Sequence, residues 1–339
     1  MRRLRGLLCS AIIFMSMYIF SRSPMYADYS QWSEARVERA RMANVDIKSQ
    51  VTPLRLLPTL DEMKSVFRHD DGDSAPPDEE TEPMPIIGGT ILPTTIEGGL
   101  KIKNQTSYQT DIGKLLKNGT DITLAADKMQ ILIIHTHSSE AYTQSGADLY
   151  EPSDINRTED TKYNIVRVGD ELEQVFRAAG LNVIHDRNIY DYPSYTGSYN
   201  RSGQAIEKYL TEYPDIQIVL DIHRDSLGEN GIIYKTVAEE NGKCSSQVML
   251  LVGTDESGLE HDSWQSNLSL AMYLQNAVSG AHPTLMRPVL LVPQRYNQHL
   301  APGALIVEVG SDGNTLQEAL YAARLFGEAA APALLALVK

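Results

Sequence analysis

From about residue 128 the chain alternates two patterns: short apolar runs of strand length, and longer stretches whose apolar residues recur every three or four positions. The first pattern is typical of buried strands and the second of amphipathic helices. Such alternation predicts an α/β domain with a mostly parallel, twisted sheet and helices on both faces. The expected strands are 131–134, 181–185, 216–222, 247–253, 289–292 and 304–309, and the expected helices are 164–180, 202–210, 263–280 and 314–330.

The N-terminus has the pattern of an export signal. The basic segment MRRLRG precedes the apolar run LLCSAIIFMSMYIF, residues 7–20. Basic residues before an apolar run indicate a signal peptide or a signal anchor, and they favour the cytoplasmic side of the membrane. We therefore expect residues 1–27 to form a basic tip and a single anchor in the cell membrane, with the rest of the chain on the extracytoplasmic side.

Residues 28–95 are expected to connect this anchor to the folded domain. Residues 28–69 are rich in helix formers and indicate a juxtamembrane helix. Residues 70–95 carry many acids and prolines and almost no aromatic residues, a composition that cannot bury enough surface to order itself. We interpret this second stretch as a disordered linker, which leaves 96–339 as the catalytic domain.

Composition excludes some classes of partner and metal site. The net charge of −14 argues against non-specific binding to nucleic acid, which requires a basic surface. The chain has two cysteines, Cys9 and Cys244, which lie far apart in sequence. Two cysteines cannot build a cysteine zinc cluster, so any metal must be held by His, Asp or Glu.

Ligand-type side chains follow three of the expected strands. Strand 131–134 leads into His135, His137 and Glu140, strand 216–222 leads into His223, and strand 304–309 carries Glu308 near its end. Ligands of open α/β sheets bind outside the carboxyl ends of the strands. We therefore expect these side chains to meet at one edge of the sheet.

The residue types point to zinc-assisted hydrolysis. Catalytic zinc sites use three protein ligands and keep one position for water. His137 and Glu140 have H-x-x-E spacing, and His223 would be the third ligand. Glu308 could then take a proton from the zinc-bound water and pass it to a leaving amine, which is the chemistry of amide hydrolysis.

Two parts of this ligand set remain open. His135 could replace His137 as the ligand, or it could orient the ligands without contacting the metal. Both alternatives arise because a continued strand would put the two histidines on one face.

The third ligand is equally open. The polar loop 141–162 must pass the site, so Glu151, Glu159 or Asp160 could stand in place of Glu140.

Other polar residues receive weaker predictions. Arg201, Arg224, Arg295 and Asn297 are candidates for substrate binding, because an arginine near a cleft can hold a carboxylate through paired hydrogen bonds. An ordinary surface salt bridge explains such arginines at least as well. Asn314 is expected to cap a helix. The remaining histidines are expected to be ordinary surface residues: His69, His185, His261, His282 and His299.

Several motifs together resemble the stage II sporulation protein P family of spore-forming bacteria. The resemblance covers roughly residues 95–335 and rests on HTHSSEAY, YNIVRVGDEL, DIHRDS, VGTD, NLSLA, RYNQHLAPGALIVEVGS and GNTLQEAL. More distantly, the chain is similar to zinc-dependent N-acetylmuramoyl-L-alanine amidases and, in its H-x-x-E…H…E order, to zinc metallocarboxypeptidases. Those amidases have a glutamate ligand where this chain has Asp160 or Lys162.

The resemblance implies a peptidoglycan hydrolase that cleaves the amide bond between N-acetylmuramic acid and L-alanine. Cross-link endopeptidase activity is also attributed to the family. Its implied setting is septal thinning and engulfment during sporulation, with the glycan-cleaving protein SpoIID and the membrane protein SpoIIM as partners. It places the zinc and catalytic functions on His137 or His135, on His223 and on Glu308.

Two other functions remain open at this point. One is a zinc carboxypeptidase that trims cell-wall peptides. The other is a catalytically inactive module that binds the cell wall.

Overall fold

The structure is a computed structural model that describes residues 90–229, 231–240 and 242–339. The expected anchor, 1–27, and the expected linker up to residue 89 lie outside the described residues. In the part of the chain that is described, no helix has both the length and the apolar character needed to span a membrane.

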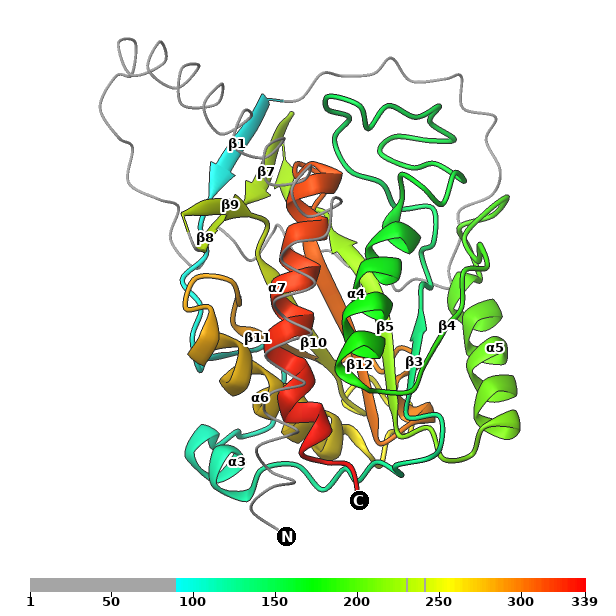
Figure 1. Cartoon of the computed structure of the whole chain (residues 1–339), viewed down its shortest axis with the longest axis vertical. Helices are drawn as coiled ribbons and strands as arrows, with labels where there is room; N and C mark the ends of the chain where they lie inside the picture. The colour runs from blue at the N-terminus through cyan, green and yellow to red at the C-terminus, as the bar shows by residue number, and fades with distance from the viewer. Residues whose placement is uncertain (1–89, 230, 241) are drawn as a thin grey trace, which may run out of the picture. The chain divides into compact units, whose positions relative to one another are not determined.

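A seven-stranded sheet lies at the centre of the described chain, in the order β2-β11-β10-β12-β5-β3-β4 (Figure 1). Neighbouring strands are parallel except for β10 and β12. This confirms the prediction of a mostly parallel sheet. The strands are β2 (Ile102–Asn104), β3 (Ile131–Ile134), β4 (Val183–His185), β5 (Ile218–Asp225), β10 (Val248–Gly253), β11 (Val289–Val292) and β12 (Gly303–Ser311).

Helices cover both faces of this sheet. Figure 1 shows α4 and α7 in front of β5, β10 and β12, with α6 beside them. On the opposite face Ile206 of α5 packs with Leu132 and Ile134 of β3. The helices are α3 (Ile112–Asn118), α4 (Ile165–Ala179), α5 (Ser198–Glu212), α6 (Trp264–Ala281) and α7 (Leu316–Leu335), and a 3₁₀ turn, η2 (Gln298–Leu300), precedes β12.

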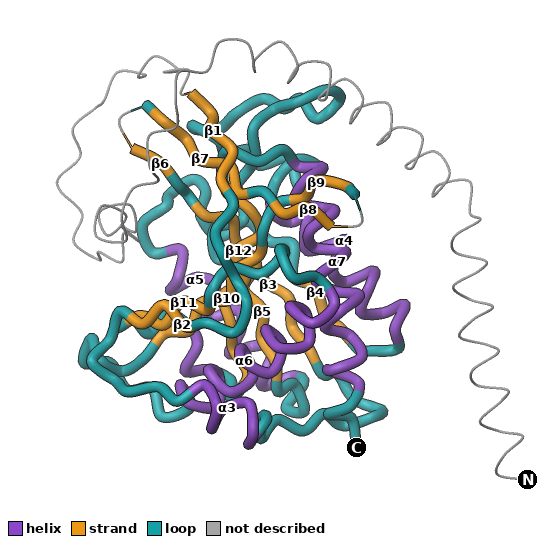
Figure 2. Tube along the Cα trace, turned by 90° about the vertical axis from the view of Figure 1, so that its left-hand side faces the viewer, coloured by secondary structure: helices purple, strands orange, loops and turns teal. Residues whose placement is uncertain are grey.

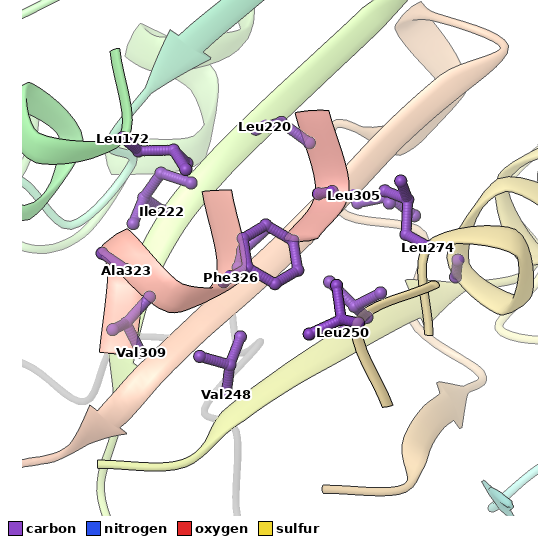
Figure 3. Packing of buried hydrophobic residues seen from close by; sticks show 14 of the residues in the cluster. Leu172, Leu220, Ile222, Val248, Leu250, Leu274, Leu305, Val309, Ala323 and Phe326 are labelled. Carbon is purple, nitrogen blue, oxygen red and sulfur yellow. The ribbon is translucent and has the colours of Figure 1, made fainter. Parts of the chain in front are cut away.

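The alternation of strand side chains decides which face each residue reaches. In β5, Leu220 and Ile222 pack with Phe326 of α7 (Figure 3). Val219 packs in the other core, on the α5 face. Because successive strand residues point to opposite faces, Asp221 and His223 lie on the α5 face as well.

The helix ends show where local sequence sets the boundaries. Helix α4 ends at Gly180, which has φ 102°, the left-handed conformation that glycine adopts readily. Helix α7 begins after Thr315, which forms a capping box with Glu318. The prediction of Asn314 as the cap is therefore wrong. The Asn314 side chain instead forms hydrogen bonds with the backbone N–H and carbonyl of Thr236.

Smaller elements lie beside the central sheet (Figure 2). Strand β1 (Thr90–Thr94) pairs in parallel with β7 (Ile232–Thr236), and β6 (Gly228–Glu229) pairs with the other side of β7. Strands β8 (Ala238–Glu240) and β9 (Lys243–Ser245) form a hairpin. Residues 90–94 of the expected linker are therefore ordered, because backbone hydrogen bonds to β7 fix a segment whose composition alone predicts disorder.

Candidate metal and catalytic site

Three adjacent parallel strands bring the predicted residues to one edge of the sheet. His137 lies in the turn after β3, His223 lies near the end of β5, and Glu308 lies near the end of β12. His223 and Glu308 are register partners on neighbouring strands. All three side chains are buried, as is Glu140. The structure thus brings together residues that are up to 171 positions apart because parallel strands end side by side.

His223 is the centre of this group. Its ring lies edge-on to the ring of His137, with centroids 5.3 Å apart and planes at 87°. Its Nδ1 is 3.6 Å from Oε2 of Glu140, and its Nε2 is 2.9 Å from Oδ1 of Asp221. One ring nitrogen therefore faces a predicted ligand, and the other faces a carboxylate that can fix the orientation of the ring.

Asp221 is a site residue that the sequence analysis missed. Its carboxylate accepts hydrogen bonds from the backbone N–H of Thr136, at 2.8 Å, and from the Thr136 hydroxyl, at 2.6 Å. Asp221 thus ties the turn that carries His137 to the strand that carries His223. The available signal was an acid inside the buried strand, two residues before His223 and therefore on the same face.

Of the four proposed third ligands, the structure brings Glu140 to the site. Its backbone N–H donates to the carbonyl of His137, so the two residues belong to one tight turn. Oε2 of Glu140 accepts a hydrogen bond of 3.0 Å from the backbone N–H of Arg224. Glu151, Glu159 and Asp160 are all exposed.

The electrostatics of the site favour a positive charge. Burial alone would lower the pKa of His223, but Asp221, Glu140 and Glu308 together raise it to about 10. Burial and repulsion by Asp225 raise the pKa of Glu308 to about 8. Oε2 of Glu308 has no hydrogen-bond partner among the described residues. A cation at this position would offset the repulsion between these carboxylates.

The chemistry of the donor set and the spacing of one donor pair fit a zinc ion. Two imidazoles and a carboxylate are a common ligand set of catalytic zinc. Zinc bonds of about 2.1 Å at tetrahedral angles put two ligand atoms about 3.4 Å apart, and the Glu140–His223 separation is 3.6 Å. His137, Glu140 and His223 are therefore the residues that would hold the ion. Their donor atoms do not all lie within 4.8 Å of one another, so a bound ion would have to draw them closer.

Aromatic residues surround His137. Its ring stacks on Tyr195, with centroids 4.4 Å apart and planes at 10°, and meets the edge of Tyr199 at 5.4 Å. Its Nε2 is 3.0 Å from the Tyr195 hydroxyl, and its Nδ1 is 3.3 Å from Oγ of Ser198. The sequence analysis did not single out these tyrosines, and nothing in their local sequence distinguishes them.

His135 lies on the opposite face of the sheet, against α4. Its Nδ1 contacts the carbonyl of Ile222 at 3.0 Å, and its Nε2 contacts Nε2 of His185 at 2.8 Å. Burial holds the pKa of His135 well below its usual range. The expectation that His135 shares a face with His137 is wrong, because β3 ends at Ile134 and the chain turns there.

A second group of potential ligands surrounds His185 on that face. Donor atoms of Asp170, Glu173 and His185 all lie within 4.8 Å of one another, a spacing that could hold a metal ion. Nδ1 of His185 is 3.4 Å from Asp170 and 3.3 Å from Glu173. The prediction that His185 is a surface residue is wrong, because α4 covers β4 and buries the ring.

The charges of this second group are already offset. Arg187 contacts both Asp170 and Glu173, and Arg177 contacts Glu173. The carbonyl of Ile222 can only accept, so Nδ1 of His135 donates to it and its Nε2 accepts from His185.

The predicted substrate-binding residues use their side chains to hydrogen-bond backbone carbonyls of nearby loops. Arg224 donates to the carbonyls of Ala141 and Asn156. Arg201 donates to the carbonyls that flank Tyr195.

The other two predicted residues also contact backbone carbonyls. Arg295 donates to the carbonyl of Glu260, and Asn297 donates to the carbonyl of Tyr199.

Arg157 is an arginine beside the site that the sequence analysis missed. Its guanidinium forms a short ion pair with Asp191 and donates to the Ser139 hydroxyl at 3.1 Å. It also lies 3.8 Å from Oε1 of Glu140 and 5.0 Å from the ring centroid of Tyr195. Arg157 thus joins the loop after β3 to the loop that carries Tyr195.

A family model described as stage II sporulation protein P matches residues 73–331. The chain belongs to this family. The stage II sporulation protein P of Bacillus subtilis strain 168 is 27% identical over 208 residues, which cover 58% of this chain and 49% of that protein. The match thus spans about half the length of that relative.

Solved amidase structures overlap this chain weakly. N-acetylmuramoyl-L-alanine amidase AmiC2 of Nostoc punctiforme is 14% identical, covers 62% of this chain and 98% of its own, and has a TM-score of 0.36. Amidase Ami1 of Mycobacterium abscessus is 13% identical, with 62% and 99% covered and a TM-score of 0.37. The CwlD amidase of Clostridioides difficile, in complex with the GerS lipoprotein, is also 13% identical, with 61% and 98% covered and a TM-score of 0.35. TM-scores below 0.5 leave these likenesses too weak to bear on function.

Proposed function

We propose that this protein is a zinc-dependent peptidoglycan hydrolase that cleaves the amide bond between N-acetylmuramic acid and L-alanine. The observation that carries the proposal is the convergence of His137, Glu140 and His223, with Glu308 beside His223 on the next strand. Membership of the stage II sporulation protein P family supports a substrate in the cell wall.

His137, Glu140 and His223 would hold the zinc ion. When bound, the ion would lower the pKa of a water molecule and polarise the amide carbonyl. Asp221 would keep the His223 ring in place through its contact with Nε2, so that Nδ1 stays directed at Glu140.

Glu308 would carry the proton. The water oxygen forms a bond to the carbonyl carbon, and Glu308 takes the proton that this water loses. The carbon–nitrogen bond then breaks, and Glu308 passes the proton to the departing amine of L-alanine. Burial raises the pKa of Glu308 above its usual range, towards neutral pH, and a general base works best when its pKa lies near the working pH.

Digestion of purified sacculi by the full-length chain tests this proposal. We expect release of whole stem peptides with a free L-alanine amine, loss of release after chelation, and recovery when zinc is added back. Equal release by the chelated and the zinc-loaded protein would rule out the zinc mechanism.

The same digestion separates the alternatives. A zinc carboxypeptidase would release single terminal amino acids, and a cross-link endopeptidase would convert dimeric stem peptides to monomers; mass spectrometry distinguishes both from amidase products. An inactive wall-binding module would sediment with sacculi and release nothing.

The cellular setting remains a set of predictions. We propose that the protein acts in septal thinning and engulfment, from a membrane anchor that faces the domain outward, together with SpoIID-like and SpoIIM-like partners. Co-purification from sporulating cells and protease accessibility in intact cells test these points.

A further inference from the structure

Tyr195 stacks on the imidazole of His137 beside the proposed zinc site. The ring planes lie at 10° and the centroids are 4.4 Å apart, while the tyrosine hydroxyl is 3.0 Å from Nε2. Nearly parallel rings place this hydroxyl above the imidazole plane and away from the in-plane lone pair of Nε2. A cation bound in that plane and the tyrosine hydroxyl can therefore be neighbours.

Ser198 offers a partner for one ring nitrogen of His137. Its hydroxyl lies 3.3 Å from Nδ1 of His137. In the neutral tautomer whose Nδ1–H donates to Ser198, Nε2 carries the lone pair and is the nitrogen able to bind zinc. The Tyr195 hydroxyl thus lies beside the metal-facing nitrogen.

The loop that carries Tyr195 is firmly held. Arg201 donates to the carbonyls of Tyr190, Ser194 and Thr196, on both sides of Tyr195. Tyr195 itself is 44% exposed, so its ring is accessible from solvent. A polar group on a rigid loop can be placed in advance of the reaction, which is the arrangement that stabilises developing charge most effectively.

We propose that Tyr195 is a further catalytic residue, whose hydroxyl donates a hydrogen bond to the carbonyl oxygen of the scissile bond. This inference rests on the proposed function. Negative charge develops on that oxygen as the attacking water forms its bond to the carbonyl carbon, and a donor already in place stabilises it. Tyr195 keeps its proton throughout, because Glu308 carries the proton to the leaving amine.

The neighbouring polar groups are less suited to this task. The guanidinium of Arg157 already binds Asp191 and Ser139. Tyr199 meets His137 through a ring-edge contact with centroids 5.4 Å apart. Tyr195 combines exposure with a hydroxyl at hydrogen-bond distance from a proposed ligand.

The test compares Tyr195→Phe with Tyr192→Phe in the full-length chain. Tyr192 belongs to the same loop and is 46% exposed, so it controls for loop chemistry. We expect Tyr195→Phe to lower kcat about 10²- to 10³-fold, as loss of one such donor does elsewhere. KM and zinc affinity should stay within about threefold, because the phenyl ring keeps the stack on His137. Tyr192→Phe should match the wild type in kcat, KM and zinc affinity.

A binding measurement separates catalysis from structure. A phosphinate analogue of the muramoyl–L-alanine amide carries a tetrahedral, negatively charged centre and mimics the transition state. Its affinity should fall in Tyr195→Phe in proportion to kcat, while the affinity for the product stem peptide stays unchanged. Loss of zinc binding together with activity would instead assign Tyr195 a structural role and overturn the inference.

The two proposals fail in different ways. A zinc-loaded wild-type protein that releases nothing from sacculi refutes the proposed hydrolase and the role of Tyr195 with it. An active wild type accompanied by an equally active Tyr195→Phe refutes the role of Tyr195 alone.

Discussion

Two histidine clusters lie on opposite faces of the same sheet and differ in how their charges are offset. The α5-face cluster consists of His137, Glu140, His223 and Glu308, together with Asp221. The α4-face cluster consists of His135, His185, Asp170 and Glu173, together with Arg187. In the first, buried carboxylates surround one histidine, and Glu308 Oε2 has no hydrogen-bond partner in the described chain. In the second, arginines contact both carboxylates.

The difference shows that donor spacing alone does not identify a metal site. The donors of the α4-face cluster are the more closely grouped, yet their charge is already balanced by guanidinium groups. In the α5-face cluster Arg157 lies 3.8 Å from Glu140, but the buried Glu308 has an oxygen without a hydrogen-bond partner among the described residues, and a buried carboxylate is costly without a cation. We therefore propose the α5 face as the zinc site, and the following predictions test that proposal.

The largest expected contrast is between His223→Ala and His185→Ala. His223→Ala should lose zinc binding and lower hydrolysis at least about 10³-fold, because it removes a ligand. His185→Ala should keep one zinc ion per chain and most of its activity, with reduced thermal stability. Metal analysis and sacculus digestion of both variants provide the measurement. The reverse pattern would move the zinc site to the α4 face.

Glu308→Gln should separate metal binding from catalysis. Glutamine keeps the shape of the side chain but cannot take a proton, so zinc content should stay at the wild-type level. Hydrolysis should fall about 10²- to 10⁴-fold, the usual contribution of a general base. Near-normal turnover in this variant would contradict the role of Glu308.

Asp221→Asn should weaken zinc affinity about 10- to 100-fold, since an outer carboxylate orients its ligand histidine. Asp170→Asn is the matched control in the α4-face cluster and should change zinc affinity less than twofold. Competition with a chelator of known affinity measures both variants. Equal losses would mean that Asp221 has no special connection to the metal.

Gly169→Ala tests the packing of the α4-face cluster. A Cβ at this position would lie 2.6 Å from Nε2 of both His135 and His185. We expect a loss of about 1–3 kcal/mol in the free energy of unfolding, as overpacking usually causes. Gly280→Ala in α6 has nothing within 4 Å of its Cβ and should be neutral or slightly stabilising. Denaturant unfolding of the two variants makes the comparison.

The contrast between the clusters also shows where prediction from sequence fails. Six of the seven strands follow from hydrophobic periodicity after residue 128, whereas the edge strand β2 precedes that alternation and was not predicted. The ends of β3, β5 and β12 could be recognised because polar side chains interrupt apolar runs there. His185 could not be recognised in this way, because its burial depends on α4, which packs over β4 from elsewhere in the chain.

The sequence by itself determined the α/β class, the family, and the presence of His137, Glu140, His223 and Glu308 at strand ends. Periodicity and strand-end position are local properties of a chain, so they can be read without a structure. Only the tertiary structure decided that His135 turns away from His137 and that Glu140, among the four candidate acids, lies beside His223. It also decided that Asp221, Arg157 and Tyr195 join the site. Those outcomes depend on where the chain turns after β3 and on which loops pack beside it, and such non-local contacts are not encoded in any single stretch of sequence.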